Sequence, residues 1–220
     1  MLGIGDLVTN ILIVITLVAI GWFGFGTIAN IRAGNRAMKW LREGLSVIGE
    51  KTTMSWIGSA AVQFKIAKAK GAFRETETVF AFEPRDVVFL WLLARLQGRR
   101  DLMIFRGTLN AAPDFELEIF DPHSWLATNS QKEIREKQWQ RLALPDQFGV
   151  QAYYSGVVDA ARVQSLITLA TRACARLTYL SIRRRLPNLQ AHWRLPNPEK
   201  VSARALFSDM RELGNQAMQT

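Results

Sequence analysis

One apolar segment near the N-terminus constrains this chain more than any other feature. Residues 7–28 carry no charged side chain, and the nearest charges on either side are Asp6 and Arg32. At 1.5 Å per residue these two dozen or so positions form a helix of roughly 30 Å or more, enough to cross the hydrocarbon core of a bilayer. A helix also satisfies its own backbone hydrogen bonds in lipid. Residues 1–30 are therefore predicted to be a transmembrane anchor.

A cleaved signal peptide is the main alternative for this segment. Signal peptides begin with a positive region and have a shorter apolar core, whereas Asp6 and no Lys or Arg precedes the span here. A retained anchor is therefore favoured. Its C-terminal flank contains the basic residues Arg32, Arg36, Lys39 and Arg42. The positive-inside rule then predicts a single-pass protein of the cell membrane, with its N-terminus outside and its C-terminal domain cytoplasmic.

The charge that follows the span indicates what the domain can bind. All 28 Lys and Arg but only 18 of the 19 acidic residues follow it, so this part has a net charge of +10. Such an excess favours anionic lipid, acidic protein or nucleic acid. Because a membrane surface is itself negative, we expect anionic lipid and a protein partner rather than nucleic acid. The single cysteine, Cys174, excludes an intramolecular disulfide, in agreement with a reducing cytoplasm.

The residues around the inner end of the span predict further helix. Apolar positions recur at helical spacing through residues 31–50, which predicts a juxtamembrane amphipathic helix. It either continues from the span or lies on the membrane, and Trp40 suits the headgroup zone. Gly21, Gly24 and Gly26 lack the GxxxG spacing, so we interpret them as ordinary membrane-helix glycines.

Residues 51–121 predict two hairpins with a short helix between them. Apolar and polar residues alternate in 62–66 and return in 79–82, which is typical of a β-hairpin. A second hairpin is expected from 102–109 and 115–120. Between the hairpins, residues 87–96 are apolar on nearly all sides. Such a short helix is expected in a core, with a partner or the membrane interface as the alternative.

The same order of elements recurs after a polar connector, residues 122–137. In the second half, residues 138–220, a hairpin is predicted from strands 139–144 and 148–154 with a turn at 145–146. A helix at about 156–176, a final hairpin from 177–184 and 189–195, and a C-terminal helix follow it. The chain thus reads as two ββαββ repeats. The predicted fold class is α+β, with one antiparallel sheet of about eight strands and helices packed on one face.

The sequence contains no recognisable catalytic or metal-binding motif. His123 and His192 are the two histidines, and no HExxH, GxSxG or CxxC pattern occurs. Glu116 and Glu118 share one face of a predicted strand, which we interpret as a solvated face rather than a metal site. Cys174 lies on the apolar stripe of a predicted helix and is interpreted as a buried structural thiol. We therefore expect no enzyme, no catalytic residue, no metal and no cofactor.

Clusters of basic side chains are the surface feature that remains. The candidate contacts for anionic lipid or a partner are Arg32, Arg36, Lys39, Arg42, Arg172, Arg176, Arg183, Arg184, Arg185 and Arg194. For the arginines, a solvated sheet edge is the alternative, because charge there discourages strand pairing.

The function expected from these features is a non-catalytic, membrane-anchored cytoplasmic interaction module, an accessory or scaffolding subunit of a membrane-associated assembly. The alternative is a domain that binds a lipid or an apolar small molecule at the membrane surface. That alternative requires a large cavity between the helix of residues 87–96 and the sheet.

Overall fold

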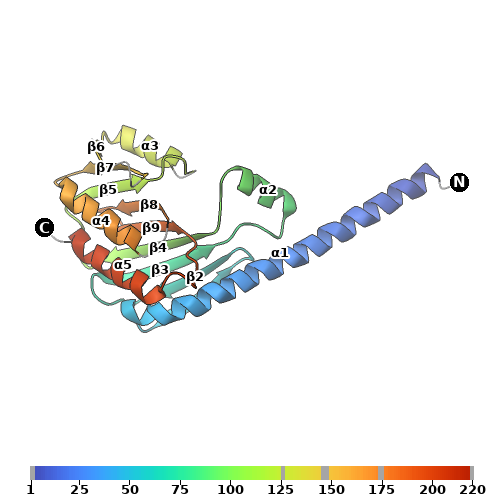
Figure 1. Ribbon diagram of the computed structural model, residues 1–220, viewed down its shortest axis with the longest axis horizontal. Coiled ribbons are helices and arrows are strands. Elements are labelled where there is room, and N and C mark those ends of the chain that lie inside the picture. The colour runs from blue at the N-terminus through green and yellow to red at the C-terminus, as the bar shows by residue number, and fades with distance from the viewer. Residues whose placement is uncertain (1–2, 125–126, 145–148, 173–175, 219–220) are drawn as a thin grey trace.

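A computed structural model describes residues 3–124, 127–144, 149–172 and 176–218 of the chain (Figure 1). In this part of the chain, helices and strands follow one another as α1 (Ile4–Ile48), β1 (Thr52–Ile57), β2 (Ala61–Ile66), β3 (Phe73–Ala81), α2 (Val88–Leu96), β4 (Leu102–Leu109), β5 (Glu116–Phe120), α3 (Ala127–Glu136), β6 (Gln140–Leu142), β7 (Gln151–Ser155), α4 (Ala160–Arg172), β8 (Leu177–Ile182), β9 (Leu189–Arg194) and α5 (Ala203–Met218). Cys174 and the predicted turn at 145–146 lie outside the described residues.

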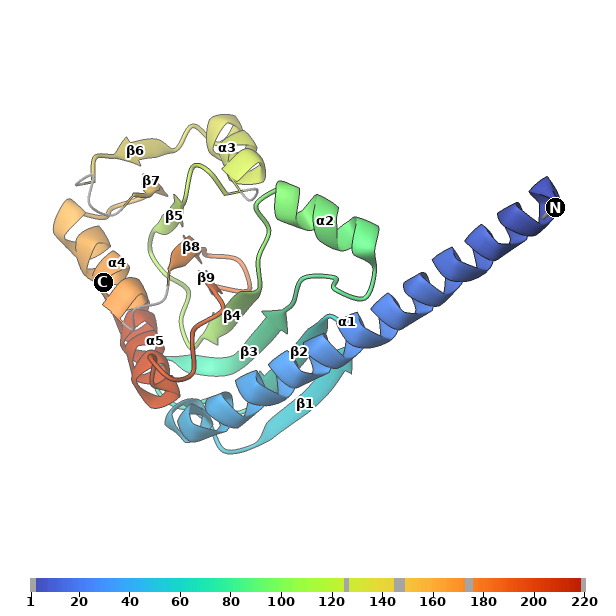
Figure 2. The ribbon, with the colours of Figure 1, turned by 45° about the vertical axis from the view of Figure 1, so that its right-hand side comes forward.

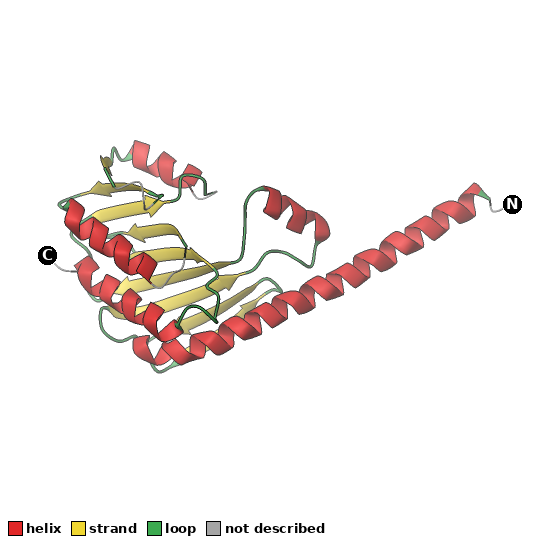
Figure 3. Cartoon of the chain, viewed as in Figure 1, coloured by secondary structure: helices red, strands yellow, loops and turns green. Residues whose placement is uncertain are grey.

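The strands of the described residues form one nine-stranded sheet in the order β1-β2-β3-β4-β9-β8-β5-β7-β6 (Figure 3). Neighbouring strands run antiparallel throughout. The predicted α+β class is therefore confirmed. The edge strand β1 was not predicted, because most of its side chains are exposed and the strand lacks the burial alternation that marks a half-buried strand.

Strand pairing agrees with three predicted hairpins and contradicts one. β2 pairs with β3, β6 with β7, and β8 with β9, as expected. The hairpin predicted from 102–109 and 115–120 is wrong: β4 pairs with β3 and β9, whereas β5 pairs with β7 and β8. Alternation identifies a strand but not its partner, and here the β8–β9 hairpin is inserted between β4 and β5. The two ββαββ halves share one sheet with interleaved strands, so a duplication stays a prediction.

The long helix α1 is continuous over 45 residues, or roughly 67 Å. Its N-terminal part projects from the domain as an exposed apolar rod, and among the described helices it is the one long and apolar enough to cross a membrane (Figure 1). Its C-terminal part packs on the domain through one stripe at helical spacing: Gly26, Asn30, Gly34, Ala37, Leu41, Gly44 and Ile48. Residues 31–48 thus continue from the apolar segment, and their apolar face covers the sheet.

Trp40 illustrates this packing and corrects its expected place in the headgroup zone. Its side chain is 4% exposed, its ring centroid lies 6.3 Å from that of Phe80, and its Nε1 donates a hydrogen bond to the carbonyl oxygen of Val201 over 2.6 Å. The ring is therefore part of the protein core.

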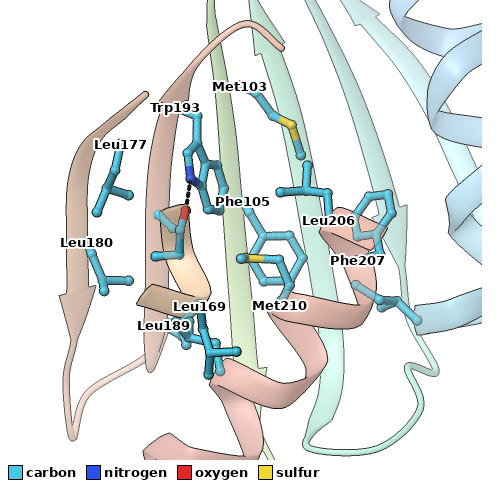
Figure 4. Close-up of a cluster of buried hydrophobic side chains, with 14 of the residues drawn as sticks. Met103, Phe105, Leu169, Leu177, Leu180, Leu189, Trp193, Leu206, Phe207 and Met210 are labelled. Carbon is cyan, nitrogen blue, oxygen red and sulfur yellow. Dashed lines mark hydrogen bonds between the residues drawn. The ribbon is translucent and has the colours of Figure 1, made fainter. Parts of the chain in front are cut away.

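The main core lies between the sheet and a layer formed by α4, α5 and the C-terminal part of α1 (Figure 3). Trp193 on β9 is fully buried at its centre, and its Nε1 donates to the carbonyl oxygen of Ala170 over 2.7 Å (Figure 4). Phe105 packs against Phe73 and Phe207, with ring centroids 5.4 and 6.4 Å away. Such aromatic side chains each bury a large apolar area and dominate the energy of a core.

Two helices lie outside this layer. α3 covers the opposite face of the sheet, where Ile134 and Trp139 form a smaller cluster with Phe120, so helices are not confined to one face. α2 stands away from the sheet beside α1 (Figures 1 and 2), and its Phe89 is 71% exposed. The expectation that residues 87–96 lie in a core is therefore wrong. The reason is that α1, α4 and α5 already cover the face that such a helix would have filled.

Candidate functional site

The candidate site begins where α1 passes the segment between β3 and α2. Gly26 permits a very close approach here, because a Cβ atom at this position would lie 2.1 Å from the carbonyl oxygen of Arg85. One turn earlier, Trp22 Nε1 donates a hydrogen bond to the same oxygen over 2.8 Å. The interpretation of Gly26 as an ordinary membrane-helix glycine is therefore wrong. Its missing side chain allows α1 and the domain to touch.

A polar network extends this contact toward the sheet. Asn30 is fully buried; its Nδ2 donates to the carbonyl oxygen of Glu83 over 3.2 Å, and its Oδ1 accepts from Arg85 Nη1 over 2.9 Å. Arg85 Nη2 donates to Asp101 Oδ2 over 2.8 Å, and Asp101 Oδ1 accepts from the Glu83 backbone N–H. Each charge is thus paired and hydrogen-bonded, as partial burial of an ion pair requires.

Glu83 connects the same network to α2. This carboxylate is 4% exposed, and its Oε2 accepts hydrogen bonds from Trp91 Nε1 at 2.7 Å and from Arg95 Nε at 3.1 Å. The Arg95 guanidinium lies 4.9 Å from the centre of the Trp91 ring, and this ring is 5.7 Å from that of Trp22.

We call this arrangement the junction and define it by the residues Trp22, Gly26, Asn30, Glu83, Arg85, Trp91, Arg95 and Asp101. It holds α1, α2 and the start of β4 together as one unit. Sequence reasoning missed it. The available signals were Trp22 and Asn30 near the C-terminal end of the apolar segment and the Glu-Pro-Arg-Asp run at 83–86.

A groove of about 650 Å³ opens beside the junction, between α1 and residues 195–199. Its lining includes Arg36 and Lys39, two of the predicted contacts, together with Glu43 and Asp101. The groove is therefore an open, mixed-charge surface. It lies between α1 and the loop before α5 and not between α2 and the sheet, so it is not the cavity that the apolar-ligand alternative requires.

The four basic residues predicted on the flank of the span share one location. Arg32, Arg36, Lys39 and Arg42 are all exposed on α1, within about four turns after the apolar segment ends. Because α1 is continuous, all four lie along the same helix directly after that segment, and we call them the basic column.

The predicted arginines of the second half do not form one surface. Arg172 pairs with Asp209 at 3.2 Å, Arg176 with Asp121 at 3.0 Å, and Arg185 with Glu133 at 3.1 Å. Burial raises the pKa of Asp209, and the charge of Arg172 opposes that shift. The exposed Arg184 donates to the carbonyl oxygen of Asp114.

Arg176 and Arg194 do come together, in a way that the sequence did not indicate. Both line a small cavity of about 130 Å³ at the end of α2, and Arg99 and Arg100, which were not among the predicted contacts, line it as well. The cationic surface next to α2 is therefore larger than predicted.

Arg183 is buried, so the prediction that it contacts lipid or a partner at the surface is wrong. It is 5% exposed and lies under α3, where Nη2 donates to the buried carboxylate of Glu118, and Nη1 donates to Glu133 over 3.2 Å. Its guanidinium stacks 4.3 Å from the centre of the Trp139 ring. Partial burial opposes ionisation of Glu133, yet the hydrogen bond from Lys137 and the charge of Arg183 lower its pKa. Arg183 directly follows the last residue of β8, and its side chain points into this interior and not to solvent.

Glu118 is likewise no solvated strand residue, since it is 1% exposed and pairs with Arg183. Among the residues that the structure describes, no cluster of three or more His, Cys, Asp or Glu side chains is placed to hold a metal ion.

The two histidines occupy different environments. His192 on β9 is 5% exposed, and its Nδ1 has no hydrogen-bond partner among the described residues. Burial lowers its pKa to about 4, helped by the charge of Arg106. Its ring centroid lies 5.0 Å from that of Tyr179, whose pKa is raised to about 12 by burial and by the charge of Glu118. His123 is exposed and lines the small cavity at the end of α2. A buried imidazole with a pKa of about 4 is a weak base.

Comparisons with known proteins give no family for this chain. No protein-family model matches the sequence, and no curated protein is significantly similar to it. Its function must therefore be inferred from its fold and from the placement of these side chains.

Proposed function

We propose that this chain is a non-catalytic interaction module anchored in the cell membrane. In this proposal residues 7–28 cross the bilayer, the N-terminus is outside, and the domain works in the cytoplasm as an accessory or scaffolding subunit of a membrane-associated assembly. One observation carries it: α1 is a single continuous helix whose N-terminal part is an exposed apolar rod and whose C-terminal part belongs to the domain core. Such a helix holds the domain at a fixed distance from the bilayer.

In the basic column on α1, we infer that the residues nearest the bilayer bind lipid and the more distant residues bind a partner protein. Counted from Ile28 at 1.5 Å per residue, Arg32 lies roughly 6 Å and Arg36 roughly 12 Å beyond the apolar segment, whereas Arg42 lies roughly 21 Å beyond it. Attraction to anionic headgroups is worth about 1 kcal/mol per nearby cation and falls off within a Debye length of about 8 Å. Because the headgroup layer itself extends roughly 5–7 Å beyond the hydrocarbon core, Arg32 lies within it and Arg36 lies within one Debye length of it. Arg32 and Arg36 are therefore assigned to lipid, and the more distant Lys39 and Arg42 to an acidic surface of a partner protein.

The other exposed arginines belong to the same proposal in a lesser role. Arg184 and Arg194 are exposed, and Arg172, Arg176 and Arg185 present partly exposed guanidinium groups that are already paired with carboxylates. The carboxylates of these pairs are largely buried, whereas the guanidinium groups stay accessible to an acidic partner.

The test is affinity capture of the full-length protein from gently solubilised native membranes, with co-purifying proteins identified by mass spectrometry. The parent chain should capture defined proteins at fixed stoichiometry. The double variant Lys39→Glu with Arg42→Glu should lose them, because it reverses the charge of the assigned contact. Lys132→Glu on α3, whose side chain is 76% exposed, is the matched control and should retain them. Capture of lipid without any defined protein, or equal capture by parent and double variant, would contradict the proposal.

Sidedness is tested separately by labelling single cysteines with a membrane-impermeant maleimide in intact cells, in a Cys174→Ser background. The proposal expects labelling at Gly3→Cys and protection at Ser46→Cys until the cells are opened. The reverse pattern would place the domain outside and refute the cytoplasmic assignment.

A further inference from the structure

α2 presents an apolar surface that the described part of the protein leaves exposed. Phe89 is 71% and Leu96 is 86% exposed. Five further apolar side chains are 38–48% exposed, namely Val87, Val88, Leu90, Leu92 and Leu93. Contiguous exposed apolar surface of this kind marks an interaction site or a membrane contact.

The place of α2 along α1 points to the membrane. The Trp91 ring packs 5.7 Å from the Trp22 ring, and Trp22 lies six residues before Ile28, the end of the apolar segment. Six residues correspond to roughly 9 Å along the helix axis, which matches the 5–10 Å to which interfacial helices penetrate a bilayer. The exposed apolar surface of α2 is therefore continuous with that of the span. With nine residues, or roughly 14 Å, α2 is too short to cross by itself.

The polar groups around α2 fit an interfacial position. Trp22 and Trp91, of a residue type enriched at membrane interfaces, both have their indole N–H satisfied inside the junction. The charge of Glu83 is compensated by Arg95 at 3.1 Å. Arg99 and Arg100 follow two residues after α2 ends, and long basic side chains of this kind can extend from an apolar surface to lipid headgroups.

We propose that α2 is a second membrane contact, a short in-plane helix whose apolar side chains lie among lipid acyl chains beside the inner end of the span. The inference rests on the proposed membrane anchoring of α1 and extends it. A single spanning helix leaves the domain free to rotate about the helix axis. A second contact, joined rigidly to the first by the junction, fixes that rotation and so decides which face of the domain meets a partner.

The experiment uses the full-length Cys174→Ser protein with one cysteine introduced at a time, at Phe89 or Leu96 on α2, at Ile15 in the span, or at Lys132 on α3. Each cysteine carries a polarity-sensitive fluorophore, and the protein is reconstituted in vesicles of equal parts phosphatidylcholine and phosphatidylglycerol. Lipids with a spin label near the headgroup end of the acyl chain serve as quenchers. The labels at 89 and 96 should emit at shorter wavelength and be quenched several-fold more than the label at 132.

The label at Ile15 separates failure of this inference from failure of the proposed function. A second set of vesicles contains lipid with its spin label deep in the acyl chain. If the label at position 15 is quenched by this lipid while the labels at 89 and 96 behave like the label at 132, the anchor stands and the second contact is refuted. If Ile15 is not quenched either, the anchoring proposal fails as well. If 89 and 96 change emission only as the protein-to-lipid ratio rises, without quenching by lipid, the surface binds a second copy of the chain and the membrane inference is overturned.

Discussion

Replacing Gly26 by Ala should break the contact between α1 and the domain. The new Cβ would lie 2.1 Å from the carbonyl oxygen and 2.3 Å from the carbonyl carbon of Arg85, both backbone atoms, whereas ordinary contact begins at 3.4 Å. The segment around Arg85 must therefore move away from α1 by more than about 1 Å. No rotation of a flexible side chain can relieve this overlap.

The cost follows from what that displacement breaks. A movement of about 1 Å takes the 2.8 Å bond from Trp22 and the 3.2 Å bond from Asn30 beyond hydrogen-bonding range. Each contributes about 0.5–1.5 kcal/mol, and overpacking adds about 1–3 kcal/mol. Ala regains about 1 kcal/mol of helix propensity over Gly. The net loss is about 3 kcal/mol, equivalent to a fall in Tm of about 6–12 °C for a chain of this size.

The assay is thermal unfolding of the full-length protein in detergent micelles, followed by circular dichroism. Gly24→Ala is the matched control, because it makes the same chemical change two residues away in the same helix, where a Cβ would meet nothing within 4 Å. It should leave Tm unchanged or raise it. Equal Tm values for Gly26→Ala and Gly24→Ala would refute the close approach at the junction.

Two further outcomes are expected from the interior of the domain. Arg183→Met leaves the 1% exposed Glu118 without its cationic partner and should lower the free energy of unfolding in urea by about 3–5 kcal/mol. The double variant with Glu118→Leu should recover most of this loss, and a single variant as stable as the parent would contradict the buried pair. Because the pKa of His192 is lowered to about 4 in the folded protein, the unfolded chain binds a proton between pH about 6.5 and 4 that the folded chain excludes. Stability should therefore fall by roughly 3 kcal/mol as the pH is lowered through this window, and His192→Gln should remove that part of the dependence; an unchanged slope of unfolding free energy against pH would show that His192 is not its source.

Local sequence patterns predicted the elements of the fold well. The charge-free run predicted the N-terminal part of α1. Every described strand except β1 was also predicted from the local pattern of apolar and polar residues. These patterns succeed because the period of apolar residues depends only on the local backbone and on which side of it is buried. β1 fails the same criterion, since it pairs at the edge of the sheet with little of its own surface covered.

The candidate site was predicted only in part. The basic column at Arg32, Arg36, Lys39 and Arg42 follows directly from its position next to the apolar segment, and the structure leaves these residues exposed. The prediction that Arg183 lies on the surface was wrong because its environment depends on distant segments. The run of three arginines is the same sequence whether its first side chain points to solvent or to the carboxylates of Glu118 on β5 and Glu133 on α3.

By itself, then, the sequence determined the apolar rod, the α+β class and the positive charge of the domain, because composition and periodicity are properties of neighbouring residues. Only the tertiary structure decided that β8 and β9 separate β4 from β5, that Gly26 contacts the backbone of Arg85, and that the described residues leave α2 exposed beside α1. Each of these depends on which distant segment occupies a given face first. That competition between long-range contacts leaves no local pattern in the chain.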